Sequence, residues 1–131
     1  MYMRVQKTKM SVVMKFGGSS LADEKRIDIV AKLIKDKRTL GTIPRSVVCS
    51  AMGQSTDWLL RAGESALVEG RVDLDDFSKL HRNVMSRLDL PQNTVKEVNA
   101  LLKECDDLLK GVSLLKELSP KTVDQLASYG E

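Results

Sequence analysis

The sequence has few of the residues that build metal, disulfide or base-stacking sites. Its 131 residues include 2 cysteines, 1 histidine and 4% aromatics. Cys49 and Cys105 form no close pair and no CxxC spacing, so neither a disulfide framework nor a zinc site is expected. His81 has no second histidine to complete a metal site. Trp58 and Phe16 are too isolated to form a base-stacking platform for single-stranded nucleic acid.

Strong net charge and long apolar runs are also missing. The chain carries 21 Lys and Arg against 18 Asp and Glu, and a net charge of +3 is too small to indicate nucleic-acid binding. No apolar run approaches the roughly 18 residues of a membrane span. The opening MYMRVQKTKM lacks the apolar stretch of a secretory signal. We therefore expect residues 1–10 to be a leader or an addition from cloning, and residues 11–131 to form one globular domain.

Two apolar runs of strand length give the fold class. Ser11–Phe16 reads SVVMKF and Ser46–Met52 reads SVVCSAM. Nearly continuous apolar runs are typical of strands covered on both faces in a parallel sheet. Each run is followed by glycine, hydroxyl side chains and a helical pattern, which predicts an α/β fold with right-handed crossovers. Both turns then lie at the carboxyl edge of the sheet, where such folds bind ligands.

The first two helices have local start and stop signals. Ser20, with Asp23 three residues later, predicts a capping box for the first helix. Gly41 and Pro44 are expected to close that helix. Its apolar face is predicted to contain Ile27, Val30, Ala31 and Ile34. For the second helix, Thr56 or Asp57 is the expected N-cap.

The second half of the chain is helical in pattern. A helix with Phe77, Leu80, Val84 and Leu88 on one face is followed by a break around Pro91. The next helix is predicted to start at Thr94, with Glu97 completing a capping box. We expect these two helices to form an antiparallel hairpin inserted on the sheet. A last helix is predicted to begin at Ser119 and Pro120 and to stop near Gly130.

The first turn has the composition of an anion site. Lys15 ends the strand, Gly17 and Gly18 follow, and Ser19 and Ser20 precede the helix. Glycines let backbone N–H groups approach a ligand, and a lysine beside them favours a phosphoryl group. The alternative is a tight turn in which glycine supplies only a positive φ. For the second turn, residues 50–57, helix capping by Thr56 is the alternative to ligand binding.

Three motifs carry a family resemblance. VMKFGGSS at 13–20, SAMGQSTD at 50–57 and LASYGE at 126–131 occur in this order. They resemble the three N-terminal signatures of aspartokinases in the amino-acid kinase superfamily, and the resemblance covers nearly all of the chain from about Ser11. The first motif has variants in kinases of acetylglutamate, glutamate and uridylate. The three together are highly specific for the aspartate enzymes.

The resemblance implies a mostly parallel sheet surrounded by helices, of which this chain would be the N-terminal, amino-acid-binding part. The implied reaction is ATP + L-aspartate to 4-phospho-L-aspartate + ADP, with Mg²⁺ accompanying ATP and no metal ligands in this chain. It would be the entry step to lysine, threonine, methionine and isoleucine synthesis. End-product regulation, a homo-oligomer, and a cytoplasmic or plastid location are also implied, with neither nucleic acid nor membrane as a partner.

For the phosphate, the resemblance implies roles in the first motif. Lys15 matches the lysine that neutralises charge on the transferring phosphoryl group. Gly17 and Gly18 match backbone donors to phosphate, and Ser19 and Ser20 match the hydroxyls beside them. These roles agree with the chemistry of phosphoryl transfer, which is catalysed mainly by positioning and by cations.

For the amino acid, the resemblance implies roles in the other two motifs. Ser50 and Thr56 match positions that hold the substrate aspartate, and Glu131 matches a glutamate that binds or orients its α-ammonium group. Gln54 and Ser55 depart from the family, which more often has a charged residue followed by threonine. No protein nucleophile is implied, because the substrate carboxylate attacks.

Two other interpretations remain open. The chain could belong to another small-molecule kinase of the superfamily, or be a non-catalytic remnant that keeps its helices only for association. Two strands are also too few for a stable sheet of this kind. We therefore expect the chain to be a truncated part of a longer protein, inactive alone.

Overall fold

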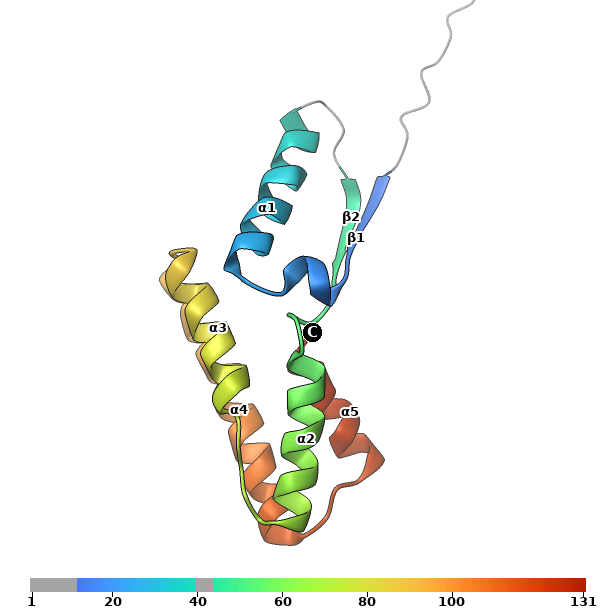
Figure 1. Ribbon diagram of the computed structural model, residues 1–131, viewed down its shortest axis with the longest axis vertical. Coiled ribbons are helices and arrows are strands. Elements are labelled where there is room, and N and C mark those ends of the chain that lie inside the picture. Colours follow the sequence, from blue (N-terminus) through green and yellow to red (C-terminus); the bar gives the residue numbers. More distant parts are fainter. Residues whose placement is uncertain (1–11, 40–43) are drawn as a thin grey trace, which may run out of the picture.

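The computed structural model describes residues 12–39 and 44–131. Two strands and five α-helices, with one short 3-10 helix, account for most of this part of the chain (Figure 1). In chain order the elements are β1 (Val12–Phe16), η1 (Gly18–Leu21), α1 (Glu24–Thr39), β2 (Pro44–Cys49), α2 (Ser55–Val68), α3 (Asp75–Arg87), α4 (Gln92–Leu115) and α5 (Pro120–Ser128).

The two strands pair in parallel, which confirms the predicted α/β class. Lys15 lies opposite Val48, and Phe16 lies opposite Cys49. The predicted second strand, 46–52, is shifted, because β2 begins at Pro44 and ends at Cys49. Proline is tolerated at the first residue of a strand, so Pro44 opens β2 and does not close α1. Ser11 and Gly41, also named in the predictions, lie outside the described residues.

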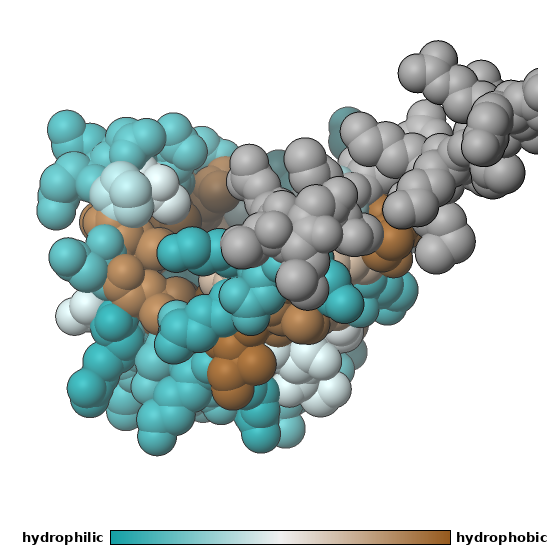
Figure 2. All heavy atoms as spheres, turned by 90° about the horizontal axis from the view of Figure 1, so that it is seen from above, coloured by the Kyte–Doolittle hydropathy of each residue, from teal (hydrophilic) through white to brown (hydrophobic). Residues whose placement is uncertain are grey.

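The strands are less covered than their apolar sequences predicted. Val13 is 63% exposed, and Val47 and Val48 are 39% and 46% exposed. Among the described elements, α1 lies beside the strands and the other helices gather beyond their carboxyl ends (Figure 1). Figure 2 views the molecule from above in the orientation of Figure 1 and shows hydrophobic residues reaching the surface. The prediction of burial on both faces is therefore wrong for this chain taken alone.

Helix α1 starts later than its predicted capping box. Residues Gly18–Leu21 form η1, so Ser20 lies inside a 3-10 turn. Asp23 takes the capping role instead, because its carboxylate accepts a hydrogen bond from the N–H of Arg26 at 2.9 Å. Val30 is buried on the predicted apolar face of α1, but Ala31 is exposed.

The hydrophobic core lies among the helices. Its fully enclosed members come from α2, α3, α4 and α5, and they are Leu59, Ala62, Ala66, Phe77, Leu102, Cys105, Leu109, Val112 and Leu126. The chain runs up α3 and back down α4, which confirms the antiparallel pair (Figure 1). The core residues of this pair cluster with those of α2 and α5, and no described strand residue belongs to that cluster.

Helix α5 packs closely on α2. A Cβ atom placed on Gly63 would lie 2.9 Å from a methyl group of Leu126, so a larger residue there would require the Leu126 side chain or the helix to shift. Ser119 caps α5 as predicted, because its hydroxyl accepts a hydrogen bond from the N–H of Thr122 at 3.2 Å. The helix ends at Ser128, and the chain end returns to the junction between sheet and helices (Figure 1).

Helix α4 begins at Gln92, two residues before the predicted start, and Pro91 occupies the N-cap position. The predicted capping box of Thr94 and Glu97 is wrong, because proline already sets the extended conformation from which the helix starts.

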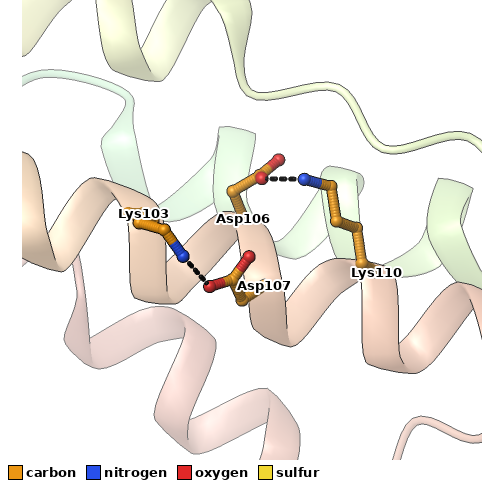
Figure 3. A network of polar contacts seen from close by, with 4 residues as sticks. All are labelled: Lys103, Asp106, Asp107 and Lys110. Carbon is orange, nitrogen blue, oxygen red and sulfur yellow. Dashed lines mark hydrogen bonds and ion pairs between the residues drawn. The ribbon is translucent and has the colours of Figure 1, made fainter.

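The solvent face of α4 carries two ion pairs, Lys103 with Asp107 and Lys110 with Asp106 (Figure 3). Each pair joins residues four apart on the helix surface. The hydrogen bond from Lys103 lowers the pKa of Asp107, and the hydrogen bond to Asp106 raises the pKa of Lys110. Such exposed pairs add little to stability.

Candidate active site

Two turns meet at the carboxyl edge of the sheet. The phosphate turn is defined as residues 16–20, after β1, and the amino-acid turn as residues 50–56, after β2. The N–H of Ser50 donates to the carbonyl of Phe16 at 3.1 Å. The N–H of Gly53 donates to the carbonyl of Gly18 at 3.2 Å. The predicted placement of both turns at one edge is confirmed.

Lys15 lies at the end of β1 with its side chain exposed. It shares the β1 face of Val13, because exposure alternates along the strand. The Lys15 ammonium makes no hydrogen bond or ion pair with any of the described residues. A free ammonium group at this edge is available to an anionic ligand.

The two glycines of the phosphate turn have different surroundings. Gly17 has φ −83° and ψ 171°, and a Cβ atom there would meet nothing within 4 Å. A Cβ atom on Gly18 would lie 3.0 Å from the carbonyl oxygen of Ala51. Neither glycine has a positive φ, so the alternative of a positive-φ turn is wrong at both positions. Gly53, with φ +53°, is the glycine that needs that conformation.

The serines of the phosphate turn are both exposed. Ser19 and Ser20 lie within η1, and the N–H of Ser20 donates to the carbonyl of Gly17 at 2.9 Å. Both side chains are therefore accessible to solvent.

The amino-acid turn is built around a serine that the sequence interpretation did not use. Ser55 is 0% exposed, and its hydroxyl donates to the carbonyl of Met52 at 2.6 Å. Helix α2 starts at Ser55, with Gln54 as N-cap and no side-chain capping bond. Capping by Thr56 or Asp57 is therefore wrong, because both lie within the first turn of α2.

Ser50 and Thr56 are the first and last residues of this turn, and both are partly exposed. Ser50 lines the cavity described below, whereas Thr56 does not. The structure therefore places both residues on the amino-acid turn, with the fixed segment Met52–Ser55 between them.

Glu131 reaches the amino-acid turn from the other end of the chain. Its Oε2 atom accepts a hydrogen bond from the N–H of Ala51 at 3.1 Å. Gly130 packs closely at this point, because a Cβ atom there would lie 3.4 Å from the Cβ of Ala51 and 3.3 Å from a methyl group of Leu59. The carboxylate therefore lies next to Ser50, and the three motifs converge on one edge.

A cavity of about 310 Å³ opens beside this junction. Ser50 and Glu131 line it, together with residues of η1, α1, β2, α3, α4, the amino-acid turn and the segment after α5, which are Leu21, Ile27, Cys49, Met52, Phe77, His81, Val98, Leu101, Leu102, Tyr129 and Gly130. Most of these side chains are apolar, so the polar groups Ser50, His81 and Glu131 stand out against the wall.

His81 is the polar wall residue that the sequence interpretation set aside. Its Nδ1–H donates to the carbonyl of Phe77 at 2.8 Å, and the two rings lie 4.3 Å apart. Burial lowers the pKa of His81, and the hydrogen bond to Phe77 opposes this in part. The four-residue spacing from Phe77 was the signal in the sequence for this contact.

Neither a metal centre nor a membrane segment is found in the described residues. Residues 12–39 and 44–131 hold no group of three or more His, Cys, Asp or Glu side chains able to bind a metal. None of the helices in this part of the chain is long and apolar enough to cross a membrane.

Comparison with known proteins assigns the family. A profile described as "Amino acid kinase family" matches residues 10–131. The chain belongs to the amino acid kinase family. It is 38% identical to Aspartokinase 1, chloroplastic, of Arabidopsis thaliana over 137 aligned residues, which cover 97% of this chain and 22% of the relative.

Solved structures of the family share the fold. E. coli aspartokinase III in complex with lysine and aspartate is 30% identical, with a TM-score of 0.78 over 92% of this chain and 26% of that one. The same enzyme in complex with aspartate and ADP is 29% identical, with a TM-score of 0.78, and the match covers 93% of this chain and 26% of that one. The chain thus spans about a quarter of the length of the family members it matches.

Proposed function

We propose that this chain is the N-terminal, amino-acid-binding part of an aspartate kinase, with its domain at residues 11–131. The reaction is ATP + L-aspartate to 4-phospho-L-aspartate + ADP. The observation that carries the proposal is the convergence of three distant motifs. Glu131 bonds to Ala51, and the amino-acid turn bonds in turn to Gly18, three residues after Lys15.

The phosphate turn supplies charge and backbone donors. The exposed ammonium of Lys15 neutralises negative charge that develops on the phosphoryl oxygens. Gly17 leaves its side of the turn open to a phosphate, and the hydroxyls of Ser19 and Ser20 donate hydrogen bonds beside it. The N–H groups at the start of a short helix such as η1 add donors. These groups orient the transferring phosphoryl group.

The amino-acid turn and Glu131 hold the acceptor. The Glu131 carboxylate pairs with the α-ammonium group of L-aspartate, and the hydroxyls of Ser50 and Thr56 hold its carboxylates. The side-chain carboxylate of the substrate attacks phosphorus, and ADP leaves. No side chain of this chain acts as a nucleophile, so its residues act by positioning and by charge.

Mg²⁺ enters with ATP in this proposal. The described residues offer no cluster of acidic side chains, and Mg²⁺ usually binds substrate phosphates and retains several waters. It supplies charge neutralisation at the phosphates when bound. The chain's own contribution remains the Lys15 ammonium and the hydroxyls near it.

The relatives also support a wider biological role. We place the reaction at the entry to lysine, threonine, methionine and isoleucine synthesis, in a homo-oligomeric, end-product-regulated enzyme. E. coli aspartokinase III has been solved with lysine in a T-state and with aspartate and ADP in an R-state. The Arabidopsis relatives are named chloroplastic, which supports a plastid location in a photosynthetic source and a cytoplasmic one otherwise.

A coupled ADP-release assay tests the function. A polypeptide that joins this chain to the remaining length of the family fold should release ADP in an L-aspartate-dependent manner, and the 131 residues alone should not. Activity with another amino acid or acyl acceptor would assign a different kinase of the family. Failure of the chain to bind L-aspartate in isothermal titration, with self-association by mass measurement, would favour a non-catalytic remnant.

A further inference from the structure

The two turns at the sheet edge touch through backbone atoms, and Gly18 is at the centre of that contact. Its carbonyl accepts the N–H of Gly53 at 3.2 Å. On its other side, a Cβ atom would lie 3.0 Å from the carbonyl oxygen of Ala51 and 3.2 Å from that of Gly53. The hydrogen atom of glycine fits this space, and a methyl group fits only if one turn moves by a few tenths of an ångström.

The opposing carbonyls have little freedom to move. The N–H of Ala51 is bonded to Glu131, and Ala51 itself is 4% exposed. Gly53 has φ +53° and packs beside Ala22, with 3.6 Å to the nearest atom from a Cβ placed on it. A methyl group at Gly18 would therefore move the phosphate turn away from the amino-acid turn, while Ala51 and Glu131 keep their contact.

From this geometry we propose that Gly18 is a positioning residue that sets the separation between the phosphate turn and the amino-acid turn. The inference rests on the proposed kinase function. In that reaction the phosphate turn orients the donor and the amino-acid turn orients the acceptor. Gly18 thereby fixes the distance between donor and acceptor, which is a different task from donating its N–H to phosphate.

The separation of the two turns matters because the rate of phosphoryl transfer depends steeply on the distance between the reacting atoms. Reacting atoms must lie about 3–3.5 Å apart, and a misplacement of about 1 Å costs roughly a hundredfold in rate. A shift of a few tenths of an ångström between the turns leaves each substrate its own contacts. It therefore affects the transfer step more than the binding of either substrate.

The test compares Gly18→Ala with Gly111→Ala in the longer, active polypeptide. Gly111 lies in α4, and a Cβ atom there meets nothing within 4 Å, so the same chemical change is harmless at this site. For Gly18→Ala we expect kcat of L-aspartate-dependent ADP formation to fall about threefold to tenfold. KM for L-aspartate and for ATP should each change less than about threefold, and Gly111→Ala should match the unmodified enzyme.

Thermal unfolding and circular dichroism separate positioning from a purely structural role. Both variants should unfold cooperatively, and kcat should be measured at a temperature where each is fully folded. An unchanged kcat per folded molecule, a rise in KM with kcat retained, or loss of the folded state would each overturn the proposal. If the unmodified polypeptide shows no L-aspartate-dependent ADP release, the proposed function fails first and the role of Gly18 fails with it.

Discussion

The carboxylate of Glu131 accepts a hydrogen bond from the backbone N–H of Ala51, 80 residues earlier in the chain. The donor is a backbone group, so the contact does not depend on a side chain at position 51. It fixes a negative charge beside Ser50 at the edge of the sheet. This contact makes the carboxyl end of the chain part of the candidate active site.

Replacing Glu131 by glutamine should weaken binding of the amino acid. The amide oxygen of Glu131→Gln still accepts the N–H of Ala51, but the charge that pairs with an α-ammonium group is lost. A charged hydrogen bond contributes about 1.5–3 kcal/mol, so KM for L-aspartate should rise at least roughly tenfold. Steady-state kinetics of the active polypeptide measure this. Glu97→Gln, on the exposed face of α4, is the control, and equal KM values for the two variants would contradict the role.

Replacing Lys15 by methionine should slow the transfer step. The apolar side chain keeps much of the length of lysine and removes the cation at the strand end. Loss of one electrostatic stabiliser of the transition state costs about 10²–10³ in kcat. Lys103→Met, which removes an exposed cation of α4, should retain full activity. A kcat for Lys15→Met within threefold of the unmodified value would show that Lys15 has no such role.

His81 should make the folded protein less stable in mild acid. Burial lowers its pKa below the ordinary value of 6.5, so the unfolded chain takes up a proton that the folded chain resists. Stability should therefore fall as pH drops through 6.5 toward the lower folded value, and then level off. Urea unfolding between pH 7.5 and 5 should show a weaker dependence for His81→Gln.

The other titrating groups on the same cavity wall are Glu131, Cys49 and Tyr129, and they are present in both proteins compared. The difference between the two pH profiles therefore isolates His81. Parallel profiles would mean that His81 titrates alike in the folded and unfolded states.

The two cysteines should differ sharply in reactivity. Cys105 is 0% exposed, and burial raises its pKa to about 12, whereas Cys49 is exposed. Thiolates react and buried neutral thiols do not. At pH 8 a chromogenic disulfide reagent should modify one thiol per folded chain and two in urea. Rapid modification of both thiols without denaturant would indicate that the helical core opens readily.

The end of α3 offers a stability test. Asp89 has φ +48°, and the N–H of Leu90 donates to the carbonyl of Met85 at 3.2 Å, as in a Schellman motif. Glycine adopts this conformation freely, and alanine does not. Asp89→Gly should therefore be about 1 kcal/mol more stable than Asp89→Ala in urea unfolding. Equal stability would mean that the turn rearranges when the side chain changes.

The parallel sheet and its two turns could be predicted because their signals are local. The apolar run ending at Lys15 and the glycines after it mark a strand and a turn without reference to the rest of the fold. Ser119 before Pro120 was equally clear as a helix start. The start of α1 was not, because η1 intervenes and leaves Asp23, rather than Ser20, next to the helix.

Tertiary contacts limited the prediction of the site. The edge rule for parallel sheets places Ser50 near the phosphate turn, but no local pattern shows that Glu131 bonds to Ala51. Only the family resemblance pointed to Glu131. The burial of Ser55 and the closeness of Gly18 to Ala51 depend on how the turns pack, which neither composition nor spacing encodes.

The close packing of Leu126 on Gly63 links the spacing of helices α2 and α5 to ligand recognition. Glu131 follows α5 by three residues, so a side chain at Gly63 that moved α5, and not only the Leu126 methyl group, would also move the Glu131 carboxylate relative to Ala51. Amino-acid affinity would then depend on the spacing between α2 and α5, although the substituted residue lies away from the site.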